Sequence, residues 1–181
     1  MIARNRLVFF VDECHLLWGD ALGYVWGPKG KRTELPITNA QERQTYYGAL
    51  NLLTGRALTY PAEAGNSDHT VAFVKHLRQR FQGRPLLLIW DGASYHRSDA
   101  VKADLREVNG ERPEDEWRIH CFQLAPHAPE QNPMEDVWLA AKNHVRKLWE
   151  KLLTFWDVNR YFTTFVECQI FDFEKLNWYG K

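Results

Sequence analysis

The chain has 181 residues, 45% hydrophobic and 14% aromatic, and its 23 basic and 23 acidic side chains give a formal net charge of +0. This composition excludes a disordered chain, and no apolar run reaches the roughly 18–20 residues that a membrane-spanning helix needs. The neutral charge also argues against a stand-alone nucleic-acid-binding protein, which is usually basic. The length fits one compact domain, and three widely spaced cysteines without a CxxC motif indicate reduced thiols.

The first predicted element is a strand over residues 6–12. This segment is rich in β-branched and aromatic residues and almost continuously apolar, which is typical of a strand buried on both faces. We expect it to end at Asp12 and Glu13. A buried carboxylate is costly without a cation beside it, so Asp12 is either an ordinary strand-end acid near solvent or part of a charged site.

The next segment predicts short strands with tight connections. Glycine and proline turn signals interrupt residues 16–30, and residues 45–53 and 56–60 predict a hairpin around Gly55. We therefore expect antiparallel pairing in this half of the chain. One turn carries a small basic group, which is either a solvated loop or a contact to phosphate, formed by Lys29, Lys31 and Arg32.

The second half predicts helices that alternate with strands. A leucine-rich strand over residues 86–90 delivers Asp91 at its carboxyl end, the edge of an open sheet where functional sites gather. Around this strand, in chain order, the pattern predicts a helix over 69–81, a helix over 98–108, an exposed loop or loose helix end over 109–116 and a strand over 118–124.

A proline-rich stretch, Ala125-Pro-His-Ala-Pro-Glu-Gln-Asn-Pro-Met-Glu-Asp-Val-Trp138, leads into a long helix that ends near Trp149. Asn132 is the expected N-cap, and Pro133 suits the first helical position because its missing N–H costs nothing there. Glu135 then lies in the first turn, where a carboxylate also complements the helix dipole. One or two further helices follow, and residues 171–181 give no clear pattern.

Three carboxylates are thus expected at the ends of three separate elements: Asp12, Asp91 and Glu135. If they converge, they repel one another unless a divalent ion neutralises them. Hard oxygen ligands suit Mg²⁺ or Mn²⁺. Two such ions about 3.5–4 Å apart activate a water or hydroxyl and stabilise the leaving oxygen of a phosphodiester.

At these residues the chain resembles a known family. Phe9-Phe-Val-Asp-Glu13, Trp90-Asp-Gly-Ala-Ser-Tyr-His96 and the block that ends at Trp138, with Pro-Glu-x-Asn-Pro-x-Glu-x-x-Trp, are similar to mariner-like bacterial insertion-sequence transposases of the DDE superfamily. The resemblance covers about residues 6–150. It implies a ribonuclease H-like fold, with Asp12 and Asp91 as the first two catalytic acids and Glu135 as the third. It also implies two Mg²⁺ ions, with Mn²⁺ as a substitute, hydrolysis at the transposon ends and attack of the freed 3′-hydroxyl on target DNA.

The chain departs from this family in two respects. Asp91 is followed by Gly-Ala where many relatives have Asn, and His127 and Gln131 replace a common Tyr and Leu, although none of these positions is a ligand. Family members also begin with helix-turn-helix segments, whereas here Asp12 lies close to Met1. We therefore expect a homodimer, or a partner chain that carries those segments, acting on DNA in the bacterial cytosol and nucleoid without membrane contact.

Several other residues are secondary candidates. Glu13 alternates to the opposite side of the strand from Asp12, and we assign it a secondary role at most. His96 is either an ordinary surface or core histidine or a group that orients a phosphate or relays a proton. Asp136 points about 100° away from Glu135 on the helix, and Trp138 is expected to hold Glu135 in place. A basic stretch of the same helix is either a solvated face or a DNA-backbone contact, formed by Lys142, Arg146 and Lys147 with His144.

The sequence thus predicts an α/β, ribonuclease H-like fold with a mixed five-stranded sheet flanked by helices. Residues 1–150 form the DDE catalytic domain, and residues 151–181 form a C-terminal helical extension of it. The predicted function is metal-dependent DNA strand cleavage and transfer. The alternatives are a nuclease of the same fold that cuts RNA in hybrids or resolves junctions, and a catalytically silent interaction module or remnant.

Overall fold

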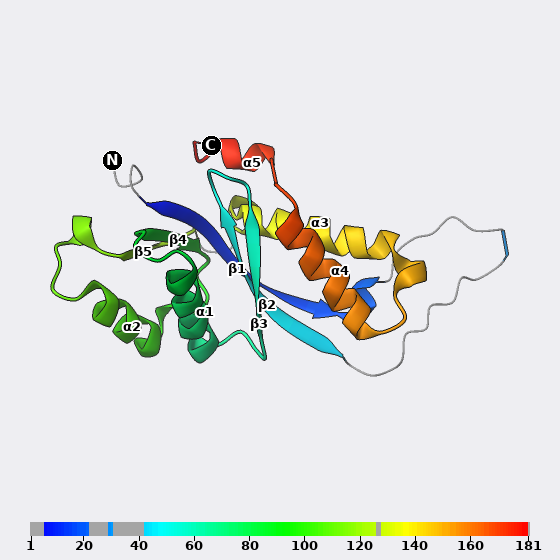
Figure 1. Ribbon diagram of the computed structural model, residues 1–181, viewed down its shortest axis with the longest axis horizontal. Helices are drawn as coiled ribbons and strands as arrows, with labels where there is room; N and C mark the ends of the chain where they lie inside the picture. The colour runs from blue at the N-terminus through cyan, green and yellow to red at the C-terminus, as the bar shows by residue number, and fades with distance from the viewer. Residues whose placement is uncertain (1–5, 22–28, 31–41, 126–127, 181) are drawn as a thin grey trace.

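The computed structural model describes residues 6–21, 29–30, 42–125 and 128–180. Its centre is one mixed sheet of five strands in the order β3-β2-β1-β4-β5 (Figure 1). The middle strand β1 pairs antiparallel with β2 and parallel with β4, which also pairs parallel with β5. This sheet confirms the predicted fold class. The strands are β1 (Leu7–Leu17), β2 (Arg43–Asn51), β3 (Ala57–Ala62), β4 (Leu86–Trp90) and β5 (Ile119–Gln123).

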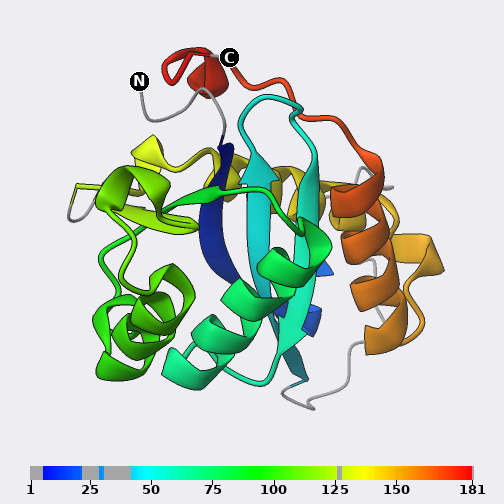
Figure 2. The same cartoon turned by 60° about the vertical axis from the view of Figure 1, so that its left-hand side comes forward.

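Helices cover both faces of the sheet, as Figure 2 shows. One face carries α1 (Ser67–Arg80) and α2 (Asp99–Asn109), and the other carries α3 (Pro133–Lys147) and α4 (Phe155–Cys168). A short helix, α5 (Glu174–Asn177), follows near the end of the chain. Single 3₁₀ turns connect these elements, at Trp18–Ala21, Ser94–Arg97, Glu114–Glu116, Pro129–Gln131 and Trp149–Lys151.

The helix starts are fixed by side-chain caps close to the predicted positions. Asn66 accepts a hydrogen bond from the backbone of His69 at the start of α1, and Ser98 caps α2. Asn132 caps α3 by accepting from Met134, and Pro133 occupies the first turn. Because these side chains satisfy amides that would otherwise lack partners, the local sequence determines where each helix begins.

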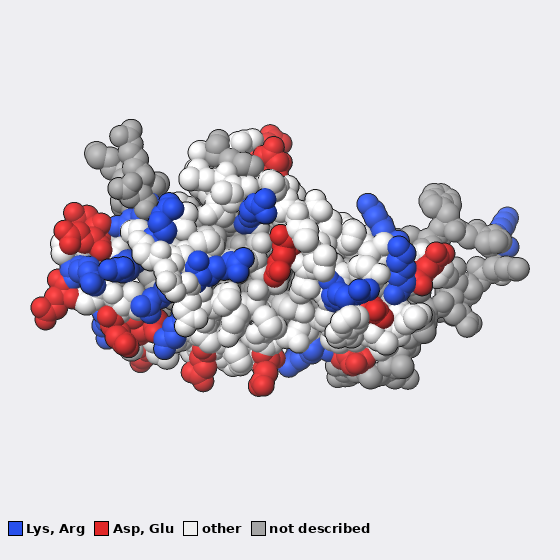
Figure 3. Space-filling model, in the orientation of Figure 1, with Lys and Arg blue, Asp and Glu red and all other residues white. Residues whose placement is uncertain are grey.

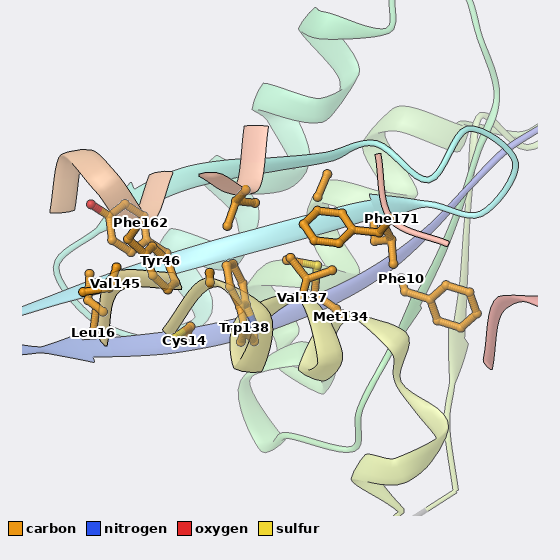
Figure 4. Close-up of a cluster of buried hydrophobic side chains, with 14 of the residues drawn as sticks. Phe10, Cys14, Leu16, Tyr46, Met134, Val137, Trp138, Val145, Phe162 and Phe171 are labelled. Carbon is orange, nitrogen blue, oxygen red and sulfur yellow. The ribbon is translucent and has the colours of Figure 1, made fainter. Parts of the chain in front are cut away.

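Alternation along β1 divides the molecule into two cores, because successive side chains of a strand point to opposite faces. Phe10, Cys14 and Leu16 pack against α3 and α4, whereas Phe9 and Val11 pack against α1 and α2. Figure 4 shows the first of these cores, in which side chains of α3 lie between β1 and α4. β1 is therefore the strand that holds the two layers together.

The predicted end of β1 was wrong. The strand does not stop at Asp12 but continues to Leu17, because β2 pairs with it antiparallel as far as Leu17↔Arg43. The parallel pairing with β4 stops earlier, at Phe10↔Ile89. Asp12 thus lies inside β1, at the point where β4 has ended and leaves one side of the strand open.

Gly48 of β2 allows α3 to approach the sheet closely. It lies opposite Asp12 in the β1–β2 pair, and a Cβ at this position would collide with the side chains of Met134 and Trp138. A strand glycine often marks such a close approach. The glycine therefore makes room for the Trp138 ring directly beside Asp12.

The C-terminal segment completes the core on the α3 face. Val158, Phe162 and Val166 of α4 are fully buried, and Tyr46 of β2 stacks on Phe162 with ring centroids 5.6 Å apart. None of the helices among the described residues combines the length and apolar character needed to cross a bilayer. The turn and strand signals predicted over residues 22–28 lie outside the described residues.

Candidate active site

The three predicted acids line one cavity at the carboxyl end of β4. The cavity has a volume of about 520 Å³ and lies between the end of β4, the loop after β5 and the start of α3. The structure thus brings Asp12, Asp91 and Glu135 together from three elements. The other residues that line it are Gly92, Ala93, Arg97, Gln123, Leu124, Ala125, Ala128 and Asn132.

Asp12 is the buried member of the group, with 8% of its surface exposed. Its Oδ2 accepts a hydrogen bond of 3.0 Å from the indole Nε1 of Trp138. Trp138 therefore holds Asp12 and not Glu135, contrary to the sequence expectation. Burial raises the pKa of Asp12 well above its ordinary value, and the negative charges of Glu135, Glu13 and Asp91 raise it further. This carboxylate needs a cation if it is to stay charged.

Asp91 follows β4 directly and is half-exposed. Its Oδ1 accepts a hydrogen bond from the backbone of Ala93 at 2.9 Å and lies 3.0 Å from Nδ1 of His96. The His96 contact has the length of an ion pair but is not directed as a hydrogen bond. The contact with His96 lowers the pKa of Asp91, and burial opposes this effect. Asp91 is therefore held in its charged form.

Glu135 lies in the first turn of α3, where the Asn132 cap places it. Asn132 also donates from Nδ2 to the backbone oxygen of Val11 at 3.0 Å, so the start of the helix is anchored to β1 next to Asp12. Burial raises the pKa of Glu135, whereas the charge of Lys175 lowers it. Asp136 points elsewhere and pairs with Lys175 at 2.6 Å.

Glu13 and His96 form a support on the opposite face of β1. Nε2 of His96 donates to Oε1 of Glu13 at 3.0 Å, and the hydroxyl of Tyr95 donates to Oε2 at 2.9 Å. The imidazole also stacks on Trp90, with centroids 4.7 Å apart. Burial lowers the pKa of His96, but the contacts with Asp91 and Glu13 outweigh burial and raise it to about 9. A protonated His96 thus bridges Glu13 and Asp91.

We expect this bridge to stabilise the metal-free protein only while His96 is protonated. Its folded pKa of about 9 lies above the ordinary 6.5, so the stabilisation is complete below pH 6.5 and disappears as the pH rises through 9. In EDTA, the free energy of unfolding should fall in His96→Gln relative to wild type by up to about 3 kcal/mol at pH 6. Urea unfolding at pH 6, 7.5 and 9.5 measures this difference, and a difference that does not shrink with pH would contradict it.

The predicted basic contacts lie apart from the cavity lining. Nζ of Lys142 is 3.2 Å from Oδ2 of Asp20, and Nε of Arg146 donates to the Asp20 backbone oxygen at 3.1 Å. These two cations hold α3 to the turn after β1. Lys147 and Lys29 are exposed. Three predicted candidates lie outside the described residues: Lys31, Arg32 and His127.

Several residues of the site were not singled out from the sequence. Arg97 is the one cation among the described residues that line the cavity, and Gln123 brings its amide next to Gly92. Tyr95 completes the support around Glu13. The sequence signal available for Tyr95 and Arg97 was their position only a few residues after Asp91. Such a short segment keeps both side chains near the carboxyl end of β4.

The arrangement offers hard carboxylate oxygens around one cavity. In the described part of the chain, no group of three or more His, Cys, Asp or Glu side chains is already placed as a ligand set. The pKa values of Asp12 and Glu135 are raised and part of that rise comes from neighbouring acids. A divalent cation in the cavity would relieve this repulsion, so the donor chemistry fits Mg²⁺ or Mn²⁺.

Comparison with solved structures shows the same fold in transposases and integrases. The structure "Mos1 mariner paired end complex with Mn" matches with a TM-score of 0.61 and 14% identity over 99% of this chain and 52% of that chain. The Mos1 catalytic domain matches with a TM-score of 0.56 and 12% identity, over 98% of this chain and 76% of that one. The HTLV-2 integrase catalytic core in complex with magnesium matches with a TM-score of 0.53 and 12% identity, over 88% and 85%.

The chain spans about half the length of the paired-end Mos1 transposase that it matches. No curated protein matched it in sequence. The family model for DDE superfamily endonucleases matches residues 7–155, which include all of the sheet, the three acids of the cavity and α3. The chain therefore belongs to the DDE superfamily endonucleases, and its fold is the one that it shares with the matched transposase and integrase catalytic domains.

Proposed function

We propose that this chain is the catalytic domain of an insertion-sequence transposase. It cleaves DNA strands at the transposon ends and joins the freed 3′-hydroxyl to target DNA. The observation that carries this proposal is the convergence of Asp12, Asp91 and Glu135 on one cavity from three separate elements. Membership of the DDE superfamily endonucleases and the likeness to transposase folds support the choice of DNA as substrate.

Two Mg²⁺ ions, or Mn²⁺ in their place, would be held by Asp12, Asp91 and Glu135. When bound, they supply positive charge that favours deprotonation of the attacking water or hydroxyl and stabilises the leaving oxygen. Trp138 fixes Asp12 in one orientation, and the Glu13–His96 support orients Asp91. Two of the three carboxylates are thus oriented before substrate arrives, which is what positioning a phosphodiester requires.

Arg97 is the residue we assign to the substrate phosphate. Arg97 lines the cavity that the acids occupy, and a guanidinium matches the two oxygens of a phosphate. The proposed partners are the transposon ends and target DNA, with a second copy or another chain supplying helix-turn-helix segments. Residues 1–150 form the catalytic unit, residues 151–181 complete its core, and the reaction takes place in the bacterial cytosol.

Removing the negative charge of one carboxylate from the cavity should weaken metal binding. We expect Asp12→Asn and Asp91→Asn each to weaken Mn²⁺ binding at least about tenfold, because hard cations need charged oxygen ligands. Calorimetric titration measures this, with and without a short DNA duplex. Asp99→Asn is the matched control, because the Asp99 side chain is fully exposed and lies outside the cavity lining.

The same proteins should be assayed for metal-dependent cleavage of a duplex that carries the element's own end. Cleavage by wild type and by Asp99→Asn, lost in the two cavity variants, is the expected result. Equal Mn²⁺ affinity in all four proteins would refute the assignment of the acids. The wild-type protein could instead be folded but neither bind Mn²⁺ in the presence of DNA nor cleave the duplex. That result would indicate a catalytically silent interaction module.

A further inference from the structure

A second cavity, of about 400 Å³, lies at the opposite end of β4 from the acids. Its walls include Leu86 and Ile119, the first residues of β4 and β5. A strand rises about 3.3 Å per residue, so β4 separates this cavity from Asp91 by roughly 13 Å or more. We call it the basic groove, because four cations line it: Lys75, Arg78, Arg84 and Arg118.

The four cations come from three segments of the chain. Lys75 and Arg78 project from α1, Arg84 lies in the connection to β4, and Arg118 immediately precedes β5. Lys75 pairs with Asp104 at 3.3 Å. No ion pair or side-chain hydrogen bond to another described residue holds the three arginine side chains, and all three residues are exposed.

Stabilisation of the helix end does not account for this arrangement. Arg78 lies in the last turn of α1, where a cation complements the helix dipole. Arg84 and Arg118 are outside any helix, yet they line the same cavity. Three guanidinium groups around one space, none of them paired with an acid in the described part of the chain, give a local excess of positive charge that attracts an anion. The chain as a whole carries no net charge, so a local excess of arginine is not a consequence of overall composition.

The basic surface extends beyond the groove. A neighbouring cavity of about 800 Å³ shares Arg84 and is also lined by Arg56 and Arg80. The acid in that cavity, Glu167, is engaged by the hydroxyl of Thr59 at 2.6 Å. Figure 3 shows basic side chains over the part of the molecule that contains β4 and β5, interspersed with acidic side chains toward the left edge. An extended anion fits this surface better than a single small one.

We propose that the basic groove binds the phosphodiester backbone of double-stranded DNA. This proposal rests on the proposed function, which makes DNA the polyanion that this chain meets. Guanidinium groups pair with phosphate oxygens in a bidentate manner and read no base sequence by doing so. Because the groove lies at the other end of β4, the DNA segment bound there is distinct from the segment at the acids. The chain thus contacts DNA at two separate places.

The test compares the wild-type chain with the triple variant Arg78→Gln, Arg84→Gln and Arg118→Gln. Binding of a labelled 30-base-pair duplex is followed by fluorescence anisotropy between 30 and 200 mM salt. EDTA is present, so that the acid cavity repels DNA and the groove is measured alone. Each lost phosphate contact lowers the slope of log affinity against log salt by about 0.9. The triple variant should lose about 2 to 3 from this slope. Because the effect of the lost contacts grows as the salt concentration falls, it should bind at least about 100-fold more weakly at 30 mM salt.

The matched control neutralises three exposed cations from other elements: Arg43→Gln, Lys102→Gln and Lys151→Gln. It has the same net charge as the groove variant and should bind DNA nearly as the wild type does. Thermal unfolding of both variants verifies that they fold. Equal losses in the two variants, or no duplex binding by wild type in EDTA, would overturn the groove as a DNA site.

Two further measurements test which polyanion the groove binds and whether groove binding and cleavage are separate properties. A polyglutamate chain is the second probe, and a groove variant that loses polyglutamate but retains DNA would identify an acidic protein as the ligand instead. Metal-dependent cleavage, measured in parallel, distinguishes the two proposals. If the wild type cleaves DNA and the groove variant binds the duplex as tightly as the wild type, the groove is not a DNA-binding site. The proposed function would still hold in that case.

Discussion

Glu135→Gln should lose metal-dependent strand cleavage by about 10³-fold or more, whereas Asp136→Asn should retain activity within about threefold. Glutamine has nearly the shape of glutamate but offers no charged oxygen to a cation. Glu135 is exposed on the cavity wall, so the substitution leaves the packing of α3 intact. A cleavage assay on an end-containing duplex, with Mg²⁺ and again with Mn²⁺, measures the rates.

The two variants form a matched pair because both remove one negative charge from the first turn of α3. Their effects on the helix dipole are therefore similar. Asp136→Asn also breaks the 2.6 Å ion pair between Asp136 and Lys175, so this variant should lose some stability as well. If the two variants lost activity equally, the charge of the helix start and not a ligand role of Glu135 would be responsible.

Gly48→Ala should lower the free energy of unfolding by about 2 to 3 kcal/mol, because the added methyl group has no space. A Cβ at this position collides with the side chains of Met134 and Trp138. The Met134 methyl can move aside, but the indole is held between β2 and the ring of Phe162, with centroids 5.7 Å apart. Displacing Trp138 also removes the hydrogen bond to Asp12, so Mn²⁺ affinity should fall as well.

Urea unfolding and calorimetric titration test both parts of this prediction. Gly19→Ala is the control, since a Cβ there meets no atom within 4 Å. Its unfolding free energy should change by no more than about 0.5 kcal/mol. A Gly48→Ala protein as stable as the control would show that α3 can move away from the sheet without cost.

Much of the fold could be predicted because local signals were strong. Asn66, Ser98 and Asn132 are side chains that cap helices, and each does so in the structure. The buried strand before Asp91 was predicted at its observed limits, because apolar residues fill it from end to end. The end of β1 was missed because it depends on pairing with β2, a long-range property that no local pattern encodes.

The supporting contacts of the site were less predictable for the same reason. The sequence indicated which acids to group, but it gave no way to assign Trp138 to Asp12 across 126 positions. The contact of His96 with Glu13 joins residues 83 positions apart. Such contacts arise from the sheet order and the packing of α3, which are settled only when the whole domain folds.

The two cores on either side of β1 have a consequence for strand register. If β1 slipped by one residue against its neighbours, Glu13 would take the place of Asp12 on the cavity side of the sheet. In an ordinary amphipathic strand such a slip is prevented, because it would turn the apolar side chains to solvent. β1 is apolar on both faces, so that safeguard is weak here. Shape must supply it instead, because Gly48 opposite Asp12 is the position that leaves room for the side chains of Met134 and Trp138. The correct acid thus faces the cavity in the register that places the one residue of β2 without a side chain beneath Trp138.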